Sequence, residues 1–182
     1  NKIDQSNSRT SYIYRFDNVG SATDPSFRAV GRLELPSNYH YHPAFGDLDG
    51  DGDADIVLGS WNDEVAYYRN DGTSASPNFV METDELLKIT RGSNTTPALV
   101  DIDADGDLDL FVGGLVIPGA YPLTPPSRLL RNDGKGKFQD VTYSAGVGHL
   151  EKGHGVAFGD IDNDGDQDLF EEMGGFYEID IF

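Results

Sequence analysis

Residues 47–55 read Asp-Leu-Asp-Gly-Asp-Gly-Asp-Ala-Asp, and the same template returns at residues 101–109 and 160–168. In each of these three windows Asp occupies positions 1, 3, 5, 7 and 9, and Gly occupies position 6. The windows hold 15 of the 32 acidic residues of the chain, so the negative charge is local. Because five carboxylates within nine residues repel one another, a compact loop at each window requires positive charge between them.

A hard divalent cation supplies that charge, and Ca²⁺ takes about six to eight oxygen ligands from carboxylates, backbone carbonyls and water. The glycine at position 6 falls where the loop turns sharply, at a positive φ that costs glycine little. The chain has no Cys, and none of its four His lies in a window, so zinc lacks its usual ligands and Mg²⁺ is a weaker alternative. The pattern predicts about three Ca²⁺ ions. The predicted metal ligands are Asp47, Asp49, Asp51, Asp53, Asp55, Asp101, Asp103, Asp105, Asp107, Asp109, Asp160, Asp162, Asp164, Asp166 and Asp168.

Two other interpretations of the acidic windows are weaker. A single Asp-rich run is often a solvated loop, but three runs in the same register are not expected by chance. An EF-hand needs a bidentate acid at position 12 and a helix on each side. Position 12 is Leu58, Val112 and Glu171, and Pro43 and Pro97 lie where an entering helix would be. We therefore treat the third window's fit to the EF-hand pattern as coincidence.

The windows belong to a longer repeat that alternates apolar segments with turns. Short apolar segments precede them at residues 43–46, 97–100 and 156–159, and alternating apolar runs follow them at residues 55–59, 109–113 and 168–170. These segments are typical of strands, so each window joins two strands that can pair as a hairpin.

A second marker, Arg-Asn-Asp-Gly at residues 69–72 and 131–134, predicts a turn into an outer strand, and Asn18-Val-Gly20 takes the same place in an earlier copy. The unit is therefore a four-stranded antiparallel meander, and internal periods of this length favour propellers or arrays. No segment has sustained helical periodicity, and residues 82–89 come nearest to it.

The segments FGDLDGDGDADIVLG (residues 45–59) and FGDIDNDGDQDLF (residues 158–170) resemble the FG-GAP/VCBS repeat of integrin-like calcium-binding β-propellers. The resemblance covers most of residues 11–175. It implies blades around an axis, each holding Ca²⁺ through the side chains at positions 1, 3, 5 and 9 and the carbonyl of position 7. The stretch from residues 128–134 through residues 155–160 to residues 174–175 also resembles the subgroup associated with ASPIC/UnbV domains. The second copy departs from the pattern, since Leu-Val replaces Phe-Gly before its window.

The fold class expected from these observations is all-β, with about three blades' worth of four-stranded antiparallel meanders. Residues 11–36 would supply the outer strands of a partial blade, residues 37–90 and 91–147 two whole blades, and residues 148–182 the start of another. Because propellers close with about four to eight blades, we expect further blades from a longer chain or from a homo-oligomer.

Composition excludes several functions. The 182 residues carry a formal charge of −19, which disfavours contact with the phosphate backbone, so no nucleic-acid partner is expected. No apolar stretch approaches the length of about 20 residues that crosses a bilayer, so no membrane insertion is expected. Calcium sites of modest affinity fill at the calcium concentrations found outside the cytosol. We therefore expect an extracellular, cell-surface or periplasmic location.

The leading functional hypothesis is a structural or recognition module, adhesion-like, for protein or glycan partners. The alternatives are part of a propeller-type polysaccharide lyase or hydrolase, or a self-assembling surface filament subunit. For an enzyme, acid–base candidates and aromatic residues that can stack on a sugar are present, although packing or surface roles are more common for these types. No nucleophile motif is found, so no catalytic residue is assigned. The acid–base candidates are His40, His42, His149, His154, Asp63, Glu64, Glu171 and Glu172, and the stacking candidates are Trp61, Tyr67 and Tyr68. Separately, residues 115–126 form a Pro-rich link that carries specificity or is an insertion.

Overall fold

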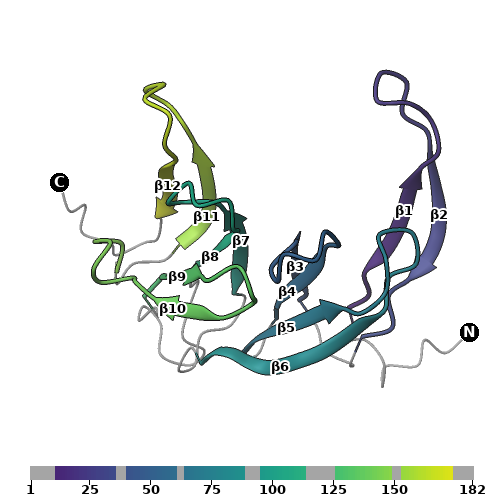
Figure 1. The fold of residues 1–182 in the computed structure, drawn as a ribbon, viewed down its shortest axis with the longest axis horizontal. Helices are drawn as coiled ribbons and strands as arrows, with labels where there is room; N and C mark the ends of the chain where they lie inside the picture. The colour runs from purple at the N-terminus through teal and green to yellow at the C-terminus, as the bar shows by residue number, and fades with distance from the viewer. Residues whose placement is uncertain are drawn as a thin grey trace, which may run out of the picture. The chain divides into compact units, whose positions relative to one another are not determined.

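The computed structural model describes residues 11–35, 40–60, 64–88, 95–113, 126–148 and 153–173 (Figure 1). The chain divides into two compact units, residues 1–41 and 42–182. Throughout the described ranges the regular structure is antiparallel β-strand, with no α-helix, and these ranges contain no helix suited to crossing a membrane. The all-β prediction is confirmed.

The first unit holds one hairpin. Strand β1 (Tyr14–Asn18) pairs antiparallel with β2 (Phe27–Arg32). The side-chain oxygen of Asn18 closes the turn by accepting the backbone N–H groups of Gly20 and Ser26, each at 3.0 Å. This is the Asn-led turn that the sequence predicts for the earliest copy.

The second unit begins with a four-stranded sheet in the order β3-β4-β5-β6. Its strands are β3 (His42–Gly46), β4 (Asp55–Gly59), β5 (Glu64–Asn70) and β6 (Phe79–Lys88). Each strand pairs antiparallel with the next, so the sheet is the predicted meander. The segment nearest to helical periodicity, residues 82–89, is strand up to residue 88, because it completes the outer edge of this sheet.

A second four-stranded sheet follows, and then a pair of strands. The order β10-β9-β8-β7 joins β7 (Thr96–Val100), β8 (Asp109–Gly113), β9 (Arg128–Asn132) and β10 (Phe138–Asp140). Strands β11 (Gly153–Gly159) and β12 (Asp168–Met173) form the next hairpin. The repeat of one meander in successive sheets confirms β-propeller blades as the architecture.

One hydrophobic core joins the two four-stranded sheets. Every residue of β4 and of β8 is buried, so the alternation expected at residues 55–59 and 109–113 is wrong there, and both strands are continuously apolar between their first Asp and their last Gly because both faces pack inside the fold. Leu48, which lies in the first acidic window rather than in a strand, is fully buried in this core. The buried members of the core are Leu48, Val57, Val65, Tyr67, Leu110, Val112 and Leu130. The acidic loop is therefore anchored to the interior by its own second residue.

Candidate metal sites

Each acidic window forms the loop of an inner hairpin, between β3 and β4, β7 and β8, or β11 and β12. The glycine at position 6 has a φ of 93° at Gly52, 96° at Gly106 and 101° at Gly165. These values lie in the region that residues with a side chain rarely adopt. The sharp turn predicted from the sequence is therefore present in all three loops.

The loops gather the carboxylates of positions 1, 3 and 9. In each loop one oxygen from each of these three residues lies within 4.8 Å of the others, which is close enough for a single ion to bind all three. The groups are Asp47, Asp49 and Asp55; Asp101, Asp103 and Asp109; and Asp160, Asp162 and Asp168. Three acidic groups that can hold metal ions thus recur in the same positions of three hairpins.

The residue at position 1 organises the loop backbone. Asp47 accepts the backbone N–H of Gly50 at 2.9 Å through Oδ1 and that of Gly52 at 2.9 Å through Oδ2. Asp160 accepts the N–H of Asp164 and of Gly165, each at 3.1 Å. In these loops the backbone donors fold towards the first carboxylate, and this holds its oxygens in place next to positions 3 and 9.

The second loop contains a buried oxygen without a partner. Asp101 Oδ2 accepts the N–H of Gly106 at 3.1 Å, but Asp101 Oδ1 is inaccessible to solvent and has no hydrogen-bond partner among the residues that the structure describes. A buried, unpaired carboxylate oxygen is costly, and a cation beside it removes the cost. This oxygen and the all-oxygen donor set both fit a hard cation such as Ca²⁺.

The carboxylates of positions 5 and 7 lie outside these groups. At position 5, Asp51 Oδ1 accepts the N–H of Asp53 at 2.9 Å, and Asp105 Oδ1 accepts that of Asp107 at 3.0 Å. At position 7, Asp53 Oδ1 accepts the N–H of Ser74 at 2.6 Å. Their role as metal ligands stays a prediction from the sequence.

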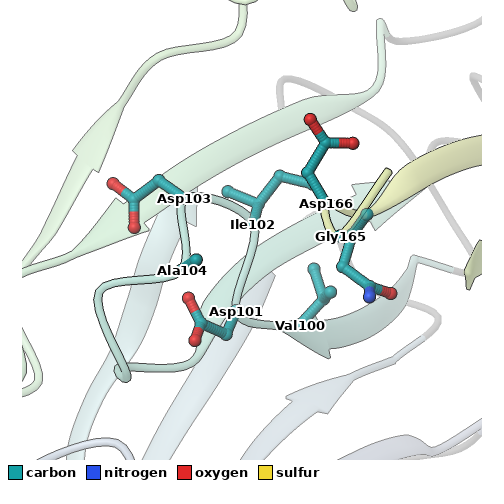
Figure 2. Close-up of a pocket in the computed structure, with 8 residues that line it drawn as sticks. Val100, Asp101, Ile102, Asp103, Ala104, Gly165 and Asp166 are labelled. Atoms are coloured by element: carbon teal, nitrogen blue, oxygen red, sulfur yellow. The ribbon is translucent and has the colours of Figure 1, made fainter. Parts of the chain in front are cut away.

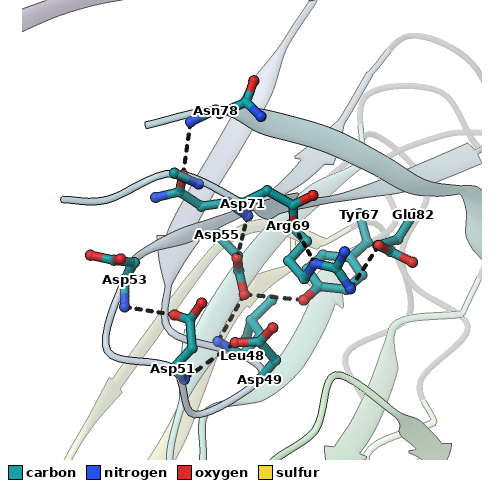
Figure 3. Close-up of polar contacts among 12 residues, drawn as sticks. Leu48, Asp49, Asp51, Asp53, Asp55, Tyr67, Arg69, Asp71, Asn78 and Glu82 are labelled. Atoms are coloured by element: carbon teal, nitrogen blue, oxygen red, sulfur yellow. Dashed lines mark hydrogen bonds and ion pairs between the residues drawn. The ribbon is translucent and has the colours of Figure 1, made fainter. Parts of the chain in front are cut away.

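The residue at position 9 has a second, structural role, which is clearest at Asp55 (Figure 3). Its side chain is fully buried, and Oδ2 accepts the N–H of Leu48 and the hydroxyl of Tyr67, both at 3.1 Å. Oδ1 accepts the N–H of Asn70, at the end of β5, at 2.8 Å. One carboxylate therefore ties the loop to the third strand of its own sheet.

Burial of this carboxylate disfavours its charged form. It raises the pKa of Asp55, and the nearby charge of Asp49 adds to the increase, while the N–H groups of Asn70 and Leu48 oppose it. Burial, together with the charge of Asp55, also raises the pKa of Tyr67, so its hydroxyl remains a donor. A cation between Asp55 and Asp49 would reverse the charge repulsion.

Asp109 repeats this arrangement in the second sheet. Its Oδ2 accepts the N–H of Ile102 at 3.0 Å and its Oδ1 accepts that of Asn132 at 2.8 Å. Burial raises the pKa of Asp109, with further increases from Asp103 and Asp105. In the third loop Asp168 Oδ2 accepts the N–H of Ile161 at 3.0 Å. The carboxylate at position 9 therefore fixes position 2 in all three loops.

A pocket of ≈ 580 Å³ lies between the second and third loops (Figure 2). It combines the acidic side chains of Asp101, Asp103 and Asp166 with the apolar side chains of Val100 and Ile102. A side-chain hydrogen bond and charge repulsion from the neighbouring position-5 carboxylate raise the pKa of Asp166. The volume of the pocket is within the range of about 300–1,000 Å³ typical of ligand pockets.

The other residues singled out from the sequence are dispersed. His42 begins β3 and Glu64 begins β5, whereas Glu171 lies on β12, where it accepts a hydrogen bond from Ser127. Tyr67 and Tyr68 are each 5% exposed, which fits packing rather than sugar stacking. His40 has a φ of 57° and donates its backbone N–H to Ser11 Oγ at 2.9 Å. The residues and side chains outside the described part are Trp61, Asp63, His149, residues 115–125 and the side chains of His154 and Glu172.

Sequence reasoning did not find the strand ends that hold position 9. Asn70 and Asn132 both donate a backbone N–H to the position-9 carboxylate of their own sheet. The signal that could have identified them is the repeated Arg-Asn-Asp-Gly marker, which on the sequence alone predicts only a turn.

Comparison with known proteins agrees with this architecture. Three segments of the chain, residues 5–58, 47–112 and 121–171, match the FG-GAP-like repeat. The chain is also similar to Cartilage acidic protein 1 from Homo sapiens, with 26% identity over 173 residues, which is 88% of this chain and 24% of that protein. The chain therefore spans about a quarter of the length of this relative. Because the matched segments cover most of the chain and each contains at least one of the acidic hairpin loops, the protein belongs to the FG-GAP-like repeat family.

Proposed function

We propose that the chain is a calcium-stabilised, extracellular segment of a β-propeller that serves as a structural and recognition module for protein or glycan partners. The observation that carries the proposal is the recurrence of three carboxylates, at positions 1, 3 and 9, within 4.8 Å of one another in three hairpin loops. Membership of the FG-GAP-like repeat family supports it.

The chain's own residues would hold the ions and would use them to stabilise the fold. The carboxylates of positions 1, 3 and 9 supply hard oxygen ligands, and the N–H groups donated to position 1 orient two of those oxygens. A bound divalent cation supplies positive charge that offsets the mutual repulsion of the carboxylates. Because position 9 is also bonded to the third strand in the two four-stranded sheets, neutralising the loop stabilises the sheet and not only the hairpin.

Recognition requires a surface where a partner can bind. The pocket between the second and third loops offers carboxylates beside apolar side chains, a combination that suits the polar and apolar faces of a sugar or a partner side chain. The human relative is named for cartilage, a connective tissue rich in extracellular matrix, and calcium concentrations outside cells fill sites of modest affinity. Both support a location outside the cytosol, at the cell surface or in the periplasm.

Thermal unfolding with and without calcium tests the stabilising role. Each site filled at about 100 times its Kd adds about 2.7 kcal/mol to the free energy of unfolding. We therefore expect a large loss of Tm in EDTA, restored by Ca²⁺ and much less by Mg²⁺. Calorimetric titration should give three sites, and replacing Asp49, Asp103 or Asp162 by Asn should each remove one. A Tm that is the same in EDTA and in calcium contradicts the proposal.

A binding screen tests recognition separately. The protein, loaded with calcium, is applied to glycan and extracellular-protein arrays. Gln167→Trp fills the pocket without changing position 1, 3 or 9 of any loop, so binding should be lost while the calcium stoichiometry is kept. A ligand that binds the Gln167→Trp variant as well as the original protein would place recognition elsewhere on the surface.

A further inference from the structure

The turn between β9 and β10 differs from its counterpart between β5 and β6 although both follow an Arg-Asn-Asp-Gly marker. In the first sheet, Asn70 Oδ1 closes its own turn by accepting the N–H groups of Gly72 at 3.0 Å and Asn78 at 2.9 Å. In the second sheet Asp133 has this task, since its Oδ1 accepts the N–H groups of Lys135 and Lys137 at 3.0 and 3.2 Å. The side chain of Asn132 is thereby released from the turn.

The released side chain of Asn132 connects two acidic loops. Its Nδ2 donates to the carbonyl of Leu48, position 2 of the first loop, at 2.9 Å, and to the carbonyl of Leu108, position 8 of the second loop, at 3.1 Å. Its backbone N–H donates to Asp109, position 9 of the second loop. Asn132 is 4% exposed, so these bonds are shielded from water.

The rest of the turn is fitted between the same two loops. Gly136 donates its N–H to the carbonyl of Leu48 at 2.8 Å, so this carbonyl accepts two hydrogen bonds from the neighbouring sheet. A Cβ on Gly134 would collide with the carboxylate of Asp107, at position 7 of the second loop. A Cβ on Gly136 would lie 3.2 Å from the hydroxyl of Tyr67, which donates to the position-9 carboxylate of the first loop. Movement of either loop therefore displaces the turn.

We infer that calcium binding at the first and second sites is coupled, and that Asn132 is the positioning residue that couples them. This inference rests on the proposed metal binding. Leu48 lies between the ligands Asp47 and Asp49, and Leu108 directly precedes the ligand Asp109. Ordering one loop fixes Asn132, and Asn132 in turn holds a carbonyl of the other loop in its bound position. The conformational cost of ordering is then shared, which gives positive cooperativity.

The second and third sites provide an internal comparison. These two loops are separated by the ≈ 580 Å³ pocket, and in the described residues no hydrogen-bonded turn lies between them. We expect them to bind calcium independently of each other. The first and second sites are thus linked, the second and third sites are not, and the second site belongs to both pairs.

Calcium titration of site-deleted variants measures the coupling. Asp162→Asn leaves the first two sites, and adding Asp49→Asn or Asp103→Asn to it leaves one site alone. We expect the product of the two Kd values in the two-site protein to be at least about fivefold smaller than the product of the single-site values. The ratio of the single-site product to the two-site product measures the coupling. For the second and third sites, compared in the same way in the Asp49→Asn variant, this ratio should be one.

Substitution of Asn132 then assigns the coupling to its side chain. Asn132→Ala should bring the ratio to one, and Asn132→Leu, which is close in size, adds no charge and removes the amide donor, should do the same if the alanine variant does not fold. The matched control is Asn70→Ala, which removes the equivalent side chain; within the described residues the hydrogen bonds of this side chain stay inside its own turn, so the variant should lower Tm while leaving the ratio unchanged. Independent first and second sites, or coupling that survives in a folded Asn132 variant, overturn the inference. Loss of calcium binding at every site would instead refute the proposed function.

Discussion

Replacing Asp55 by Ala tests whether position 9 is a structural link as well as a metal ligand. The buried carboxylate accepts hydrogen bonds from Leu48 N–H, Asn70 N–H and Tyr67 hydroxyl. Each buried donor left without a partner costs about 1–3 kcal/mol, which gives about 3–9 kcal/mol for the three. Burial raises the pKa of Asp55, which means that its charged form is disfavoured in the fold, so removing this carboxylate recovers part of the cost of the three unpaired donors. We therefore expect a loss of about 3–5 kcal/mol in EDTA, against a typical total stability of about 5–15 kcal/mol.

The assay is urea unfolding followed by circular dichroism in EDTA, so that metal binding does not contribute. The control is Asp51→Ala, which removes the same charge from the same loop. Asp51 is exposed and accepts a hydrogen bond only from Asp53 among the contacts that the structure describes, so water can replace it. We expect its effect to be below about 1 kcal/mol. Equal losses for the two variants in EDTA would show that the link through Asp55 does not stabilise the fold.

Three further predictions follow from the same geometry. Gly59→Ala should cost more stability than Gly159→Ala when the two are compared by thermal unfolding, because a Cβ on Gly59 would overlap the backbone carbonyl of Thr95 whereas a Cβ on Gly159 would meet nothing within 4 Å. The metal-free protein should lose stability as pH rises from near 4 through the raised pKa values of Asp55 and Asp109, because the folded state holds these protons more tightly than the unfolded state. Calcium should reverse this trend, since its ligands must be deprotonated to bind it. Measurements of Tm against pH in EDTA and in calcium check both signs. Leu48→Ala should cost about 2–5 kcal/mol in urea unfolding even in EDTA, because this loop side chain is fully buried in the core; a change seen only with calcium present would contradict this.

Much of the fold could be predicted from the sequence because its signals are local. The acidic windows, the apolar runs beside them and the Asn-led turns each act within one hairpin, and the strands appear where those signals place them. The gathering of positions 1, 3 and 9 follows from the sharp turn at position 6, which a glycine at each copy makes readable.

The contacts between sheets could not be predicted in this way. Asn70 and Asn132 occupy the same place in the same four-residue marker, yet one closes its own turn and the other reaches a neighbouring loop. The difference arises from the length of the turn that follows, residues 71–78 in one sheet and 133–137 in the other, and from Asp133 taking over the closing role in the shorter turn. Both of these features are local, but the Leu48 carbonyl that the released Asn132 amide contacts belongs to another repeat, and no single repeat contains that information.

The burial of Leu48 has a consequence for how such loops can diverge. The nine-residue spacing is constrained twice, once by the ion that the carboxylates would surround and once by the leucine that must reach the interior. Adding or deleting one residue after position 2 would still leave several acids nearby, but would pull this side chain out of register with the strands it contacts. Loop length should therefore resist change even in descendants that have abandoned the metal, where the exposed aspartate at position 5 is free to change while those at positions 1 and 9 are kept by their hydrogen bonds to the backbone.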